Sequence, residues 1–361
     1  PPAVPSKTTM PIAKSRTVGL TVRVFTRFED CPVTPAEWDE AVARLGGPIY
    51  QTFDWLQTWW ELYGRDRQLR LFVFQTADQT VGILPFYLET FGWGPLKTTV
   101  VRLVGANIPP KTFNPPVTPE YAPAVLAGAV RHLFRADGCD LLALGPVSDA
   151  WPGSHACRRL AEQEDCLRWV SSCRYAPHGV QTWFSLPATF EEYLKSLGST
   201  ERKNRLKRMR HLEKGRQVTT DMVADPGLVE QEFDTFVRQH ARQWQAVGKG
   251  GHFTAWPQGE VYNRAQVKAQ ARHGRVRFFR MLVDGQVVCR RYTFLLGSTL
   301  YSELPAREVG EPWDKLGIGG ISLLKFNEQV IHLGITGVDS GLGDYEHKAN
   351  LGGQRRYMTP A

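Results

Sequence analysis

The sequence predicts an α+β fold in two domains, each a mixed, mostly antiparallel twisted sheet flanked by helices. One order of elements occurs twice, from Leu69 to Leu144 and from Arg275 to Asp339: strands, a loop or turn, a helix and a strand. Antiparallel strands followed by a single crossover helix indicate α+β rather than repeated βαβ winding. With 361 residues the chain is long enough for two domains, which we place at residues 18–180 and 181–361.

Alternating apolar residues predict strands, and apolar residues three to four positions apart predict helices. The first half then contains strands at Val18–Phe25, Leu69–Phe74, Thr80–Leu88 and Leu141–Leu144, and helices at Pro35–Leu45, Phe53–Tyr63 and Ala124–Phe134. The glycine- and proline-rich stretch Gly92–Pro119 predicts an irregular loop. Trp55 and Trp59 share a helix face that could line a ligand groove, although core packing is the more common role of tryptophan.

The second half follows the same rules, with tight hairpin turns at Asp284-Gly285 and Gly297-Ser298. Its predicted strands are Thr182–Leu186, Arg275–Leu282, Gln286–Leu296, Thr299–Leu304 and Gly337–Asp339. Its predicted helices are Phe190–Leu197, a helix capped by Ser199 and ended by Gly215, Phe233–Val247 and Ile321–Leu333.

The composition is that of a globular protein with a mild basic excess. The chain has 42% hydrophobic and 22% charged residues and a net charge of +8. No apolar run approaches the ~20 residues that a membrane span needs. Residues 1–17 lack the apolar core of a signal peptide and predict a disordered lead, with Met10 as an alternative start. We therefore expect a cytoplasmic protein.

Cysteine and histidine residues gather in one stretch of the chain. These residues are His155, Cys157, Cys166, Cys173 and His178. Their spacing matches no standard zinc module, and no Cys-x-x-Cys pair occurs. We expect reduced thiols and no metal site.

A glycine-rich turn lies between strand and helix in the second half, where backbone N–H groups can hold a phosphate. The candidate donor-binding residues in this turn are Lys315, Gly317, Gly319 and Gly320. If the strands on either side of the crossover helix splay apart, an extended donor fits between them with its phosphates on the turn. A tight entry turn is the alternative reason for the glycines. The first half has Pro115–Pro119 at the equivalent place, and since proline lacks an N–H we expect a degenerate first domain.

A basic helix precedes the second-half hairpin. Arg202, Lys203 and Arg205 lie in its first turns, at the positive end of the helix dipole, where cations are mildly unfavourable. An anionic ligand would relieve this repulsion, so we expect these side chains to contact donor phosphates, a nucleic acid or an anionic glycan. A solvated amphipathic helix is an equally weighted alternative.

Several segments together resemble a known family. They are Phe53–Trp60 followed by Val81–Pro85, Ser199–Gly215, and Gly343–Lys348. In their order and spacing the chain, from Gln51 to Gly352, resembles the tandem form of the GNAT acyltransferase superfamily. It is most similar to the CelD-like acetyltransferases linked to cellulose or exopolysaccharide synthesis, and more distantly to the Fem-type aminoacyl transferases of peptidoglycan synthesis. His347 and Leu351 stand where the family usually has Tyr and Trp.

The resemblance implies two tandem GNAT-like domains, of which the second binds the donor. The usual donor of the superfamily is acyl-CoA, with acetyl-CoA the first expectation, and that of the Fem relatives is aminoacyl-tRNA.

Acyl transfer to an amine needs a general base and an acid for the leaving group. Tyr301 and Glu303 alternate with Ser302 and so share a strand face. We expect Glu303 or Asp344 to act as the base and Tyr301 as a proton donor. Substrate-side candidates are Trp244, Asp339, His347 and Lys348. A structural ion pair between Asp344 and Lys348 is the alternative.

Three functions remain open from the sequence. The leading one is transfer of an acyl group from acyl-CoA to an amine or hydroxyl of a polar small molecule or sugar precursor. The second is Fem-type transfer from charged tRNA. The third is a non-catalytic role as a partner in polysaccharide biosynthesis.

Overall fold

The computed structural model describes residues 19–360, except 78, 107, 110, 113, 152, 157–159 and 161–178. The expected N-terminal lead with Met10, and Cys157, Cys166, Cys173 and His178 of the cysteine–histidine stretch, fall outside these residues. Within them no group of three His, Cys, Asp or Glu residues is arranged to hold a metal ion. None of the described helices has the length and apolar character to cross a membrane.

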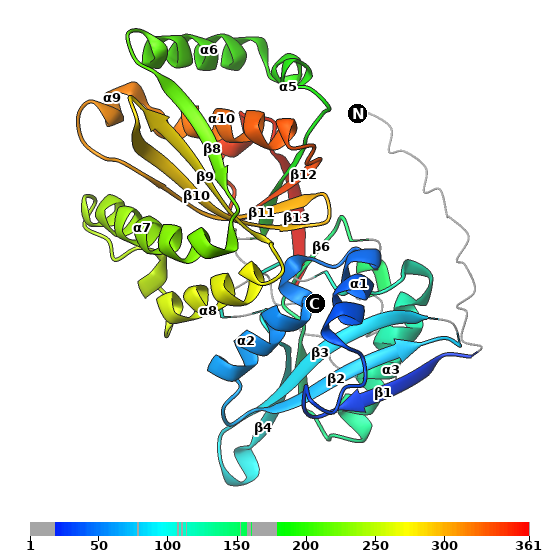
Figure 1. The fold of residues 1–361 in the computed structure, drawn as a ribbon. Helices are drawn as coiled ribbons and strands as arrows, with labels where there is room; N and C mark the ends of the chain where they lie inside the picture. The colour runs from blue at the N-terminus through cyan, green and yellow to red at the C-terminus, as the bar shows by residue number, and fades with distance from the viewer. Residues whose placement is uncertain are drawn as a thin grey trace, which may run out of the picture.

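The N-terminal domain is one sheet between two helical layers (Figure 1). Its strands lie in the order β1 (Thr21–Phe25), β2 (Gln68–Gln75), β3 (Thr80–Phe91), β4 (Thr98–Leu103) and β5 (Leu141–Ala143). Neighbouring strands are antiparallel except β4 and β5, which are parallel. Helix α3 (Ala122–Arg135) covers one face, and α1 (Pro35–Arg44) and α2 (Phe53–Tyr63) cover the other. The predicted mixed sheet is confirmed.

Strand β4 lies inside the stretch predicted to be irregular, so that prediction was wrong. It pairs with β3 from Phe86 to Phe91, and its Val101 and Leu103 are buried in the core beneath α3. Glycines and prolines on both sides of this short strand led to the prediction of an irregular loop. Trp55 and Trp59 are fully buried in α2, so core packing, and not a ligand groove, is their role.

The C-terminal domain is a longer mixed sheet. Its strands lie in the order β6 (Pro146–Ser148), β13 (Gln354–Pro360), β7 (Val180–Ser185), β12 (Gly337–Leu342), β11 (Thr299–Arg307), β10 (Gln286–Leu296), β9 (Val276–Val283) and β8 (Val218–Val223). Only the β11–β12 pairing is parallel within this described sheet. Strand β6 precedes the expected domain boundary at residue 180, yet it pairs with β13.

Helices cover both faces of this sheet. Helix α10 (Ile318–His332), together with α5 (Phe190–Ser196) and α6 (Ser199–Glu213), packs on one face, and α7 (Pro226–Gln245) and α8 (Gly259–Ala271) pack on the other. The sequence missed β8, α8 and β13, and placed the start of α7 too late. Asp225 caps α7 by accepting from the Gly227 amide at 2.7 Å, and Pro226 begins the helix. Ser199 does not cap α6, because Gly198 occupies that position.

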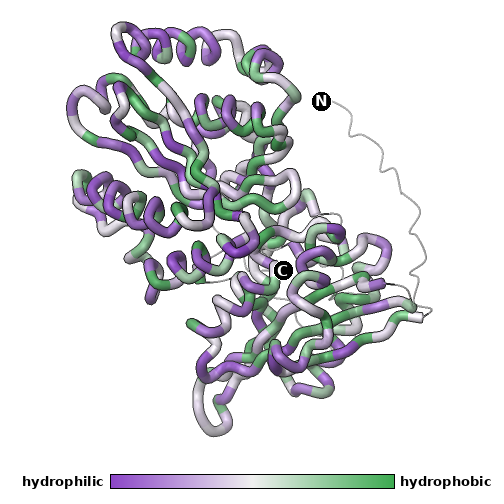
Figure 2. The backbone as a smooth tube through the Cα atoms, in the orientation of Figure 1, coloured by the Kyte–Doolittle hydropathy of each residue, from purple (hydrophilic) through white to green (hydrophobic). Residues whose placement is uncertain are grey.

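The two domains share a buried core at their junction. Ile49, Tyr50 and Trp55 of the first domain cluster with Phe233 and Phe294 of the second. Polar contacts also cross the junction, including an ion pair between Arg275 and Asp39 at 2.6 Å. Figure 2 shows apolar stretches along the strands of both domains, whereas α6 is mostly hydrophilic. A site at the junction is therefore fixed by both halves of the chain.

Candidate functional site

The expected wedge is present between β11 and β12. The two strands pair only at Thr299–Gly337, Leu300–Val338 and Tyr301–Asp339. Beyond Tyr301 strand β11 continues to Arg307, while β12 shifts register against β7 between Asp339 and Leu342. An irregularity in the β10–β11 ladder at the Tyr292/Thr293 step further bends β11 at this place. The splayed strands leave an unpaired backbone edge that an extended ligand can contact.

Helix α10 begins at the wide end of this wedge, one turn earlier than predicted. Gly317 adopts a left-handed conformation (φ 66°) between the short helix α9 (Trp313–Leu316) and α10, and Gly319 and Gly320 lie in the first turn of α10. The amides of Gly317 and Gly320 already bond to the carbonyl oxygens of Trp313 and Gly317. The amides of Ile318 and Gly319 make no backbone bond outside the helix in the described part of the chain. Two donors, not four, are therefore available for an anion.

Three arginines surround this helix start. A Cβ added at Gly320 would overlap the Arg205 guanidinium, and one at Gly319 would lie 3.4 Å from Cδ of Arg307. A Cβ at Gly317 would lie 3.5 Å from Nη1 of Arg208. Arg205 pairs with Glu201 and Arg307 pairs with Asp314, each at 2.5 Å, so two of the three charges are partly balanced. Cations at a helix N-terminus oppose its dipole, and an anion that bridges these side chains and the helix start would be favoured. Of the expected donor residues, Arg205 reaches this point, whereas Lys203 and Lys315 are exposed.

Deeper in the wedge lie a buried arginine and a half-buried lysine, of which the sequence analysis anticipated only the lysine. Arg291 of β10 is 8% exposed, and its Nε atom has no hydrogen-bond partner among the described residues. Burial lowers its pKa to about 10. Lys348, in the short helix α11 (Glu346–Ala349), donates to the Ser340 carbonyl at 2.6 Å. Burial and then the charge of Arg291 lower the pKa of Lys348 to about 8, against the opposing effect of Asp339.

His347 belongs to the same group of charges. Its pKa is lowered first by burial and then by Lys348, Arg291 and Arg205. His347 is exposed and Arg205 is paired with Glu201 at 2.5 Å, so the basic charge that lies inward is that of Arg291 and Lys348. Buried charge of one sign is unfavourable unless a partner balances it, so the geometry suits an anionic ligand.

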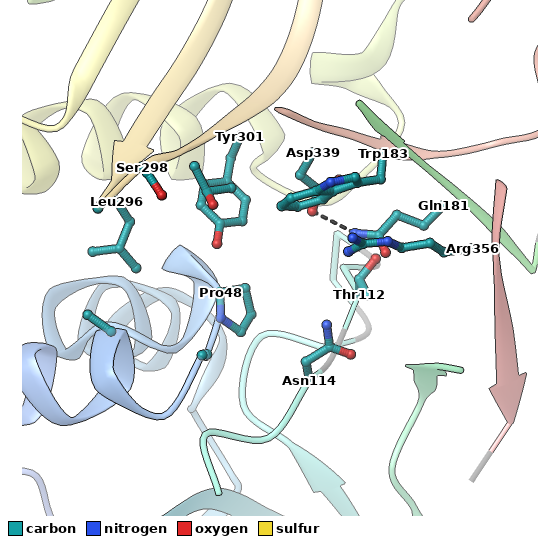
Figure 3. A pocket seen from close by; sticks show the side chains of 15 residues that line it. Pro48, Thr112, Asn114, Gln181, Trp183, Leu296, Ser298, Tyr301, Asp339 and Arg356 are labelled. Atoms are coloured by element: carbon teal, nitrogen blue, oxygen red, sulfur yellow. Dashed lines mark hydrogen bonds between the residues drawn. The ribbon is translucent and has the colours of Figure 1, made fainter. Parts of the chain in front are cut away.

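A cavity of about 280 Å³ opens at the narrow end of the wedge, between the two domains (Figure 3). The first domain contributes Ala43, Gly46, Gly47, Pro48, Thr112 and Asn114, and the second Gln181, Trp183, Leu296, Gly297, Ser298, Thr299, Tyr301, Asp339 and Arg356. Tyr301, Asp339 and Trp183 stand opposite one another on adjacent strands, which explains why they share this wall. Arg356 lies over the Trp183 ring at 3.9 Å.

Asp339 is the acidic residue best placed for chemistry in this cavity. It is 3% exposed and accepts from Nε2 of Gln181 at 2.7 Å and from the Gly341 amide at 2.8 Å. Burial raises the pKa of Asp339, and the two hydrogen bonds oppose that rise. Burial also raises the pKa of Tyr301, which keeps its hydroxyl protonated. A carboxylate and a phenol thus meet where the wedge and the cavity join.

Glu303 shares the strand face of Tyr301 as expected, but it is already engaged. Its carboxylate accepts from the Tyr50 hydroxyl at 3.0 Å and forms an ion pair with Lys111, both from the first domain. It does not line the cavity. In this arrangement Glu303 joins the domains, which argues against its predicted role as the base.

Other expected residues lie outside the cavity wall. Asp344 forms a half-exposed ion pair with Arg355 at 2.7 Å, so the alternative pairing with Lys348 was wrong. Trp244 packs against His240 and His252 near the end of α7. Arg202 lies on α6, half-buried.

Sequence reasoning missed several residues of the site. They are Arg291, Arg307, Lys111, Gln181, Trp183 and Arg356. Arg291 carried a usable signal, since Arg290 and Arg291 interrupt an otherwise apolar strand, where arginine is rarely buried.

Residues 199–349 match the model of the acetyltransferase (GNAT) domain. Among solved structures, the chain is similar to FemX with a TM-score of 0.60 and 11% identity, over 91% of this chain and 94% of that one. It is also similar to L-PGS from Bacillus licheniformis, with a TM-score of 0.50 and 12% identity over 90% of each chain. These likenesses bear out the α+β fold with two mixed, mostly antiparallel sheets. No curated protein sequence matches the chain. The CelD-like branch stays a prediction.

Proposed function

We propose, from the GNAT acetyltransferase match of residues 199–349, that the protein transfers an acyl group from a donor in the wedge to an acceptor in the interdomain cavity. The observation that carries this proposal is the pair of inward basic residues, the buried Arg291 and the half-buried Lys348, beside a wedge that ends at Asp339. This pair supplies the charge that an anionic donor needs. The cavity supplies a separate place for the acceptor.

Acyl-CoA is the donor that fits the wedge best. From Tyr301 to Arg307 the strand spans about 20 Å at ~3.3 Å per residue, a length suited to an extended pantetheine arm. The thioester then lies beside Tyr301 and Asp339, and the diphosphate lies at the start of α10 among Arg205, Arg307 and the free amides. An acetyl group is the smallest acyl group that satisfies this arrangement.

The reaction needs a neutral amine or an activated hydroxyl as the nucleophile. Asp339 accepts the proton of the nucleophile as its nitrogen or oxygen bonds to the carbonyl carbon. Lys348 stabilises the negative charge that develops on the carbonyl oxygen. The carbon–sulfur bond then breaks, and the Tyr301 hydroxyl donates a proton to the departing thiolate. The cavity, with one indole and several amide and hydroxyl groups, suits a polar small molecule or sugar precursor as acceptor.

Donor binding is tested by calorimetry with acetyl-CoA on the full chain. Gly319 has no positive φ, so Gly319→Leu covers the free amides without backbone strain. We expect the affinity for acetyl-CoA to fall roughly tenfold, which corresponds to about 1.4 kcal/mol of binding free energy. Gly198→Leu is the matched control, since Gly198 faces open space and lies at the start of α6. Absence of binding by the unaltered protein would count against acyl-CoA as the donor.

The role of Asp339 is tested by Asp339→Asn, which keeps the shape and an acceptor for the Gly341 amide. We expect the turnover rate to fall by roughly 10²–10⁴ with donor affinity retained. Because the pKa of Asp339 is raised, the activity of the unaltered protein should fall as the pH decreases through that raised pKa. The pH–activity profile of the variant should lack this decrease on the acidic side. Asp344→Asn, in the exposed ion pair, is the control and should leave the rate unchanged.

A second candidate donor is aminoacyl-tRNA, as the Fem-type resemblance implies. The outer face of α6 favours it, because Lys203, Lys207 and Arg210 are exposed there. Salt-sensitive retention of tRNA together with no affinity for acetyl-CoA would select this donor. Failure to bind either would leave the role of a non-catalytic partner in polysaccharide biosynthesis.

A further inference from the structure

The turn between β3 and β4 carries large apolar side chains into solvent. It projects from the N-terminal domain on the side away from the C-terminal domain (Figure 1). Trp93 is 82% exposed and Leu96 is 77% exposed, and Phe91 at the end of β3 is 47% exposed. Single exposed apolar residues are common on protein surfaces. Three exposed apolar side chains within six positions of one projecting turn form an apolar patch, and such patches mark interaction sites.

The backbone of this turn is held in one conformation. Gly92 and Gly94 have φ of 77° and 56°, which favour glycine, and a Cβ at Gly92 would overlap the Leu96 carbonyl oxygen. The Leu96 amide donates to the Trp93 carbonyl at 3.2 Å, and the Lys97 amide donates to that of Gly94 at 3.3 Å. Trp93 and Leu96 are therefore presented outward by a formed turn and are not part of a loose loop.

The tip itself carries one cation and no carboxylate, and the charges around its base are mixed. No acidic residue occurs from Thr90 to Thr99, and Lys97 lies at the base of the turn. Glu89, the nearest preceding carboxylate, is bound by Arg67 at 2.7 Å and lies near Arg102 at 3.5 Å. Because β2 begins opposite Leu88, the exposed pair of Arg65 with Asp66 at 3.8 Å lies at the same end of the sheet and adds no net charge. Asp140 accepts from the Thr99 amide at 2.7 Å. Lys97 is the charged residue nearest to the apolar side chains, and a negatively charged surface complements it.

The size of the tip selects among partners. A stable protein interface buries about 800 Å² on each side, more than three side chains at the end of a narrow turn provide. A bilayer needs only that the side chains enter it, and tryptophan prefers the boundary between headgroups and acyl chains. We propose that the Phe91–Lys97 turn inserts into the surface of an anionic lipid bilayer and attaches the protein peripherally. This attachment is independent of the acyl-transfer site.

The test is flotation of the full chain with vesicles of phosphatidylcholine containing roughly one-third phosphatidylglycerol. The tip variant is Trp93→Ser combined with Leu96→Ser. The control is Leu228→Ser combined with Val247→Ser, which alters two exposed apolar residues at opposite ends of α7. We expect the unaltered protein and the control to float and the tip variant to float about tenfold less, since two apolar anchors are lost. Matching melting temperatures verify that all three are folded.

A second measurement locates the tip in the bilayer. Brominated phosphatidylcholine quenches only tryptophans that enter the acyl region, and the chain has 11 tryptophans. Trp93→Phe should keep vesicle binding and lose most of the quenching. No flotation of the unaltered protein, or equal flotation of the tip variant, would overturn the proposal. So would self-association that the tip substitutions abolish without any vesicle binding, because the tip would then contact a second copy.

Discussion

The central feature at the scale of single residues is the buried Arg291, which contacts the Phe326 ring, close to the half-buried Lys348. Arg291 is buried and Lys348 is half-buried, and burial first and then the charge of Arg291 lower the pKa of Lys348 to about 8. Such an arrangement costs folding free energy. A bound anion between the two side chains would offset that cost and so stabilise the folded protein.

Lys348→Met tests this cost through stability. The folded-state pKa of Lys348 lies below its usual 10.5, so between about 8 and 10.5 the unfolded chain binds more protons. The free energy of unfolding should therefore rise with pH across that window. We expect Lys348→Met to be more stable than the unaltered protein near neutral pH by about 1–2 kcal/mol, with the gap closing towards pH ~10. Transfer activity should fall because the oxyanion loses its cation.

Urea unfolding at several pH values measures the difference. Lys325→Met is the control, because Lys325 pairs with Glu213 and Glu328 and has balanced charge. A Lys348→Met protein that is less stable near neutral pH, with an unchanged pH dependence of stability, would show that the folded protein does not disfavour the charged form of Lys348.

Some contacts of the residues on β11 could be predicted from the sequence, and others could not. Strand alternation alone placed Tyr301 and Glu303 on one face, and both contact Tyr50. The partners of Glu303 lie 253 and 192 positions away, in a turn and a loop without a periodic pattern. The sequence therefore predicted the face correctly and assigned Glu303 a catalytic role that its ion pair opposes.

At the scale of elements, periodicity predicted the order around the wedge but not its boundaries. The β11–α10–β12 order and the splay of the strands are confirmed. The start of α10 was placed late, since glycines suggested a turn where Gly319 and Gly320 are helical. Short strands with few apolar residues, such as β8 and β13, give too weak an alternation to detect. The wedge was thus predicted, whereas the arginines beside the start of α10 were found only in the structure.

Gly317 and Gly319 form a matched pair that tests the start of α10. Gly317 has a φ of 66°, so Gly317→Ala should destabilise the protein by roughly 1–2 kcal/mol. Gly319 is helical and a Cβ there meets only the flexible Arg307 side chain at 3.4 Å, so Gly319→Ala should be neutral or stabilising by up to about 1 kcal/mol. Urea unfolding of both variants measures the contrast. Equal effects would contradict a left-handed break between α9 and α10.

At the scale of the whole molecule, the cavity exists because two domains pack as one unit. The shared aromatic core and the contacts of Glu303 with Tyr50 and Lys111 join the domains beside the cavity wall. Lys111 immediately precedes Thr112, which lines the cavity. We therefore expect calorimetry to record a single unfolding transition, because neither domain keeps this core when the other unfolds.

The Lys111–Glu303 pair tests the coupling between domains. The Glu303 side chain is 7% exposed, so Lys111→Met leaves a buried carboxylate without a cation and should cost about 3–5 kcal/mol. Combining it with Glu303→Gln removes that charge while keeping an acceptor for Tyr50, and should restore much of the loss. A double-mutant cycle by urea unfolding gives the coupling energy. If the two changes in the free energy of unfolding were additive, the ion pair would not join the domains. The aromatic core alone would then fix the shape of the cavity.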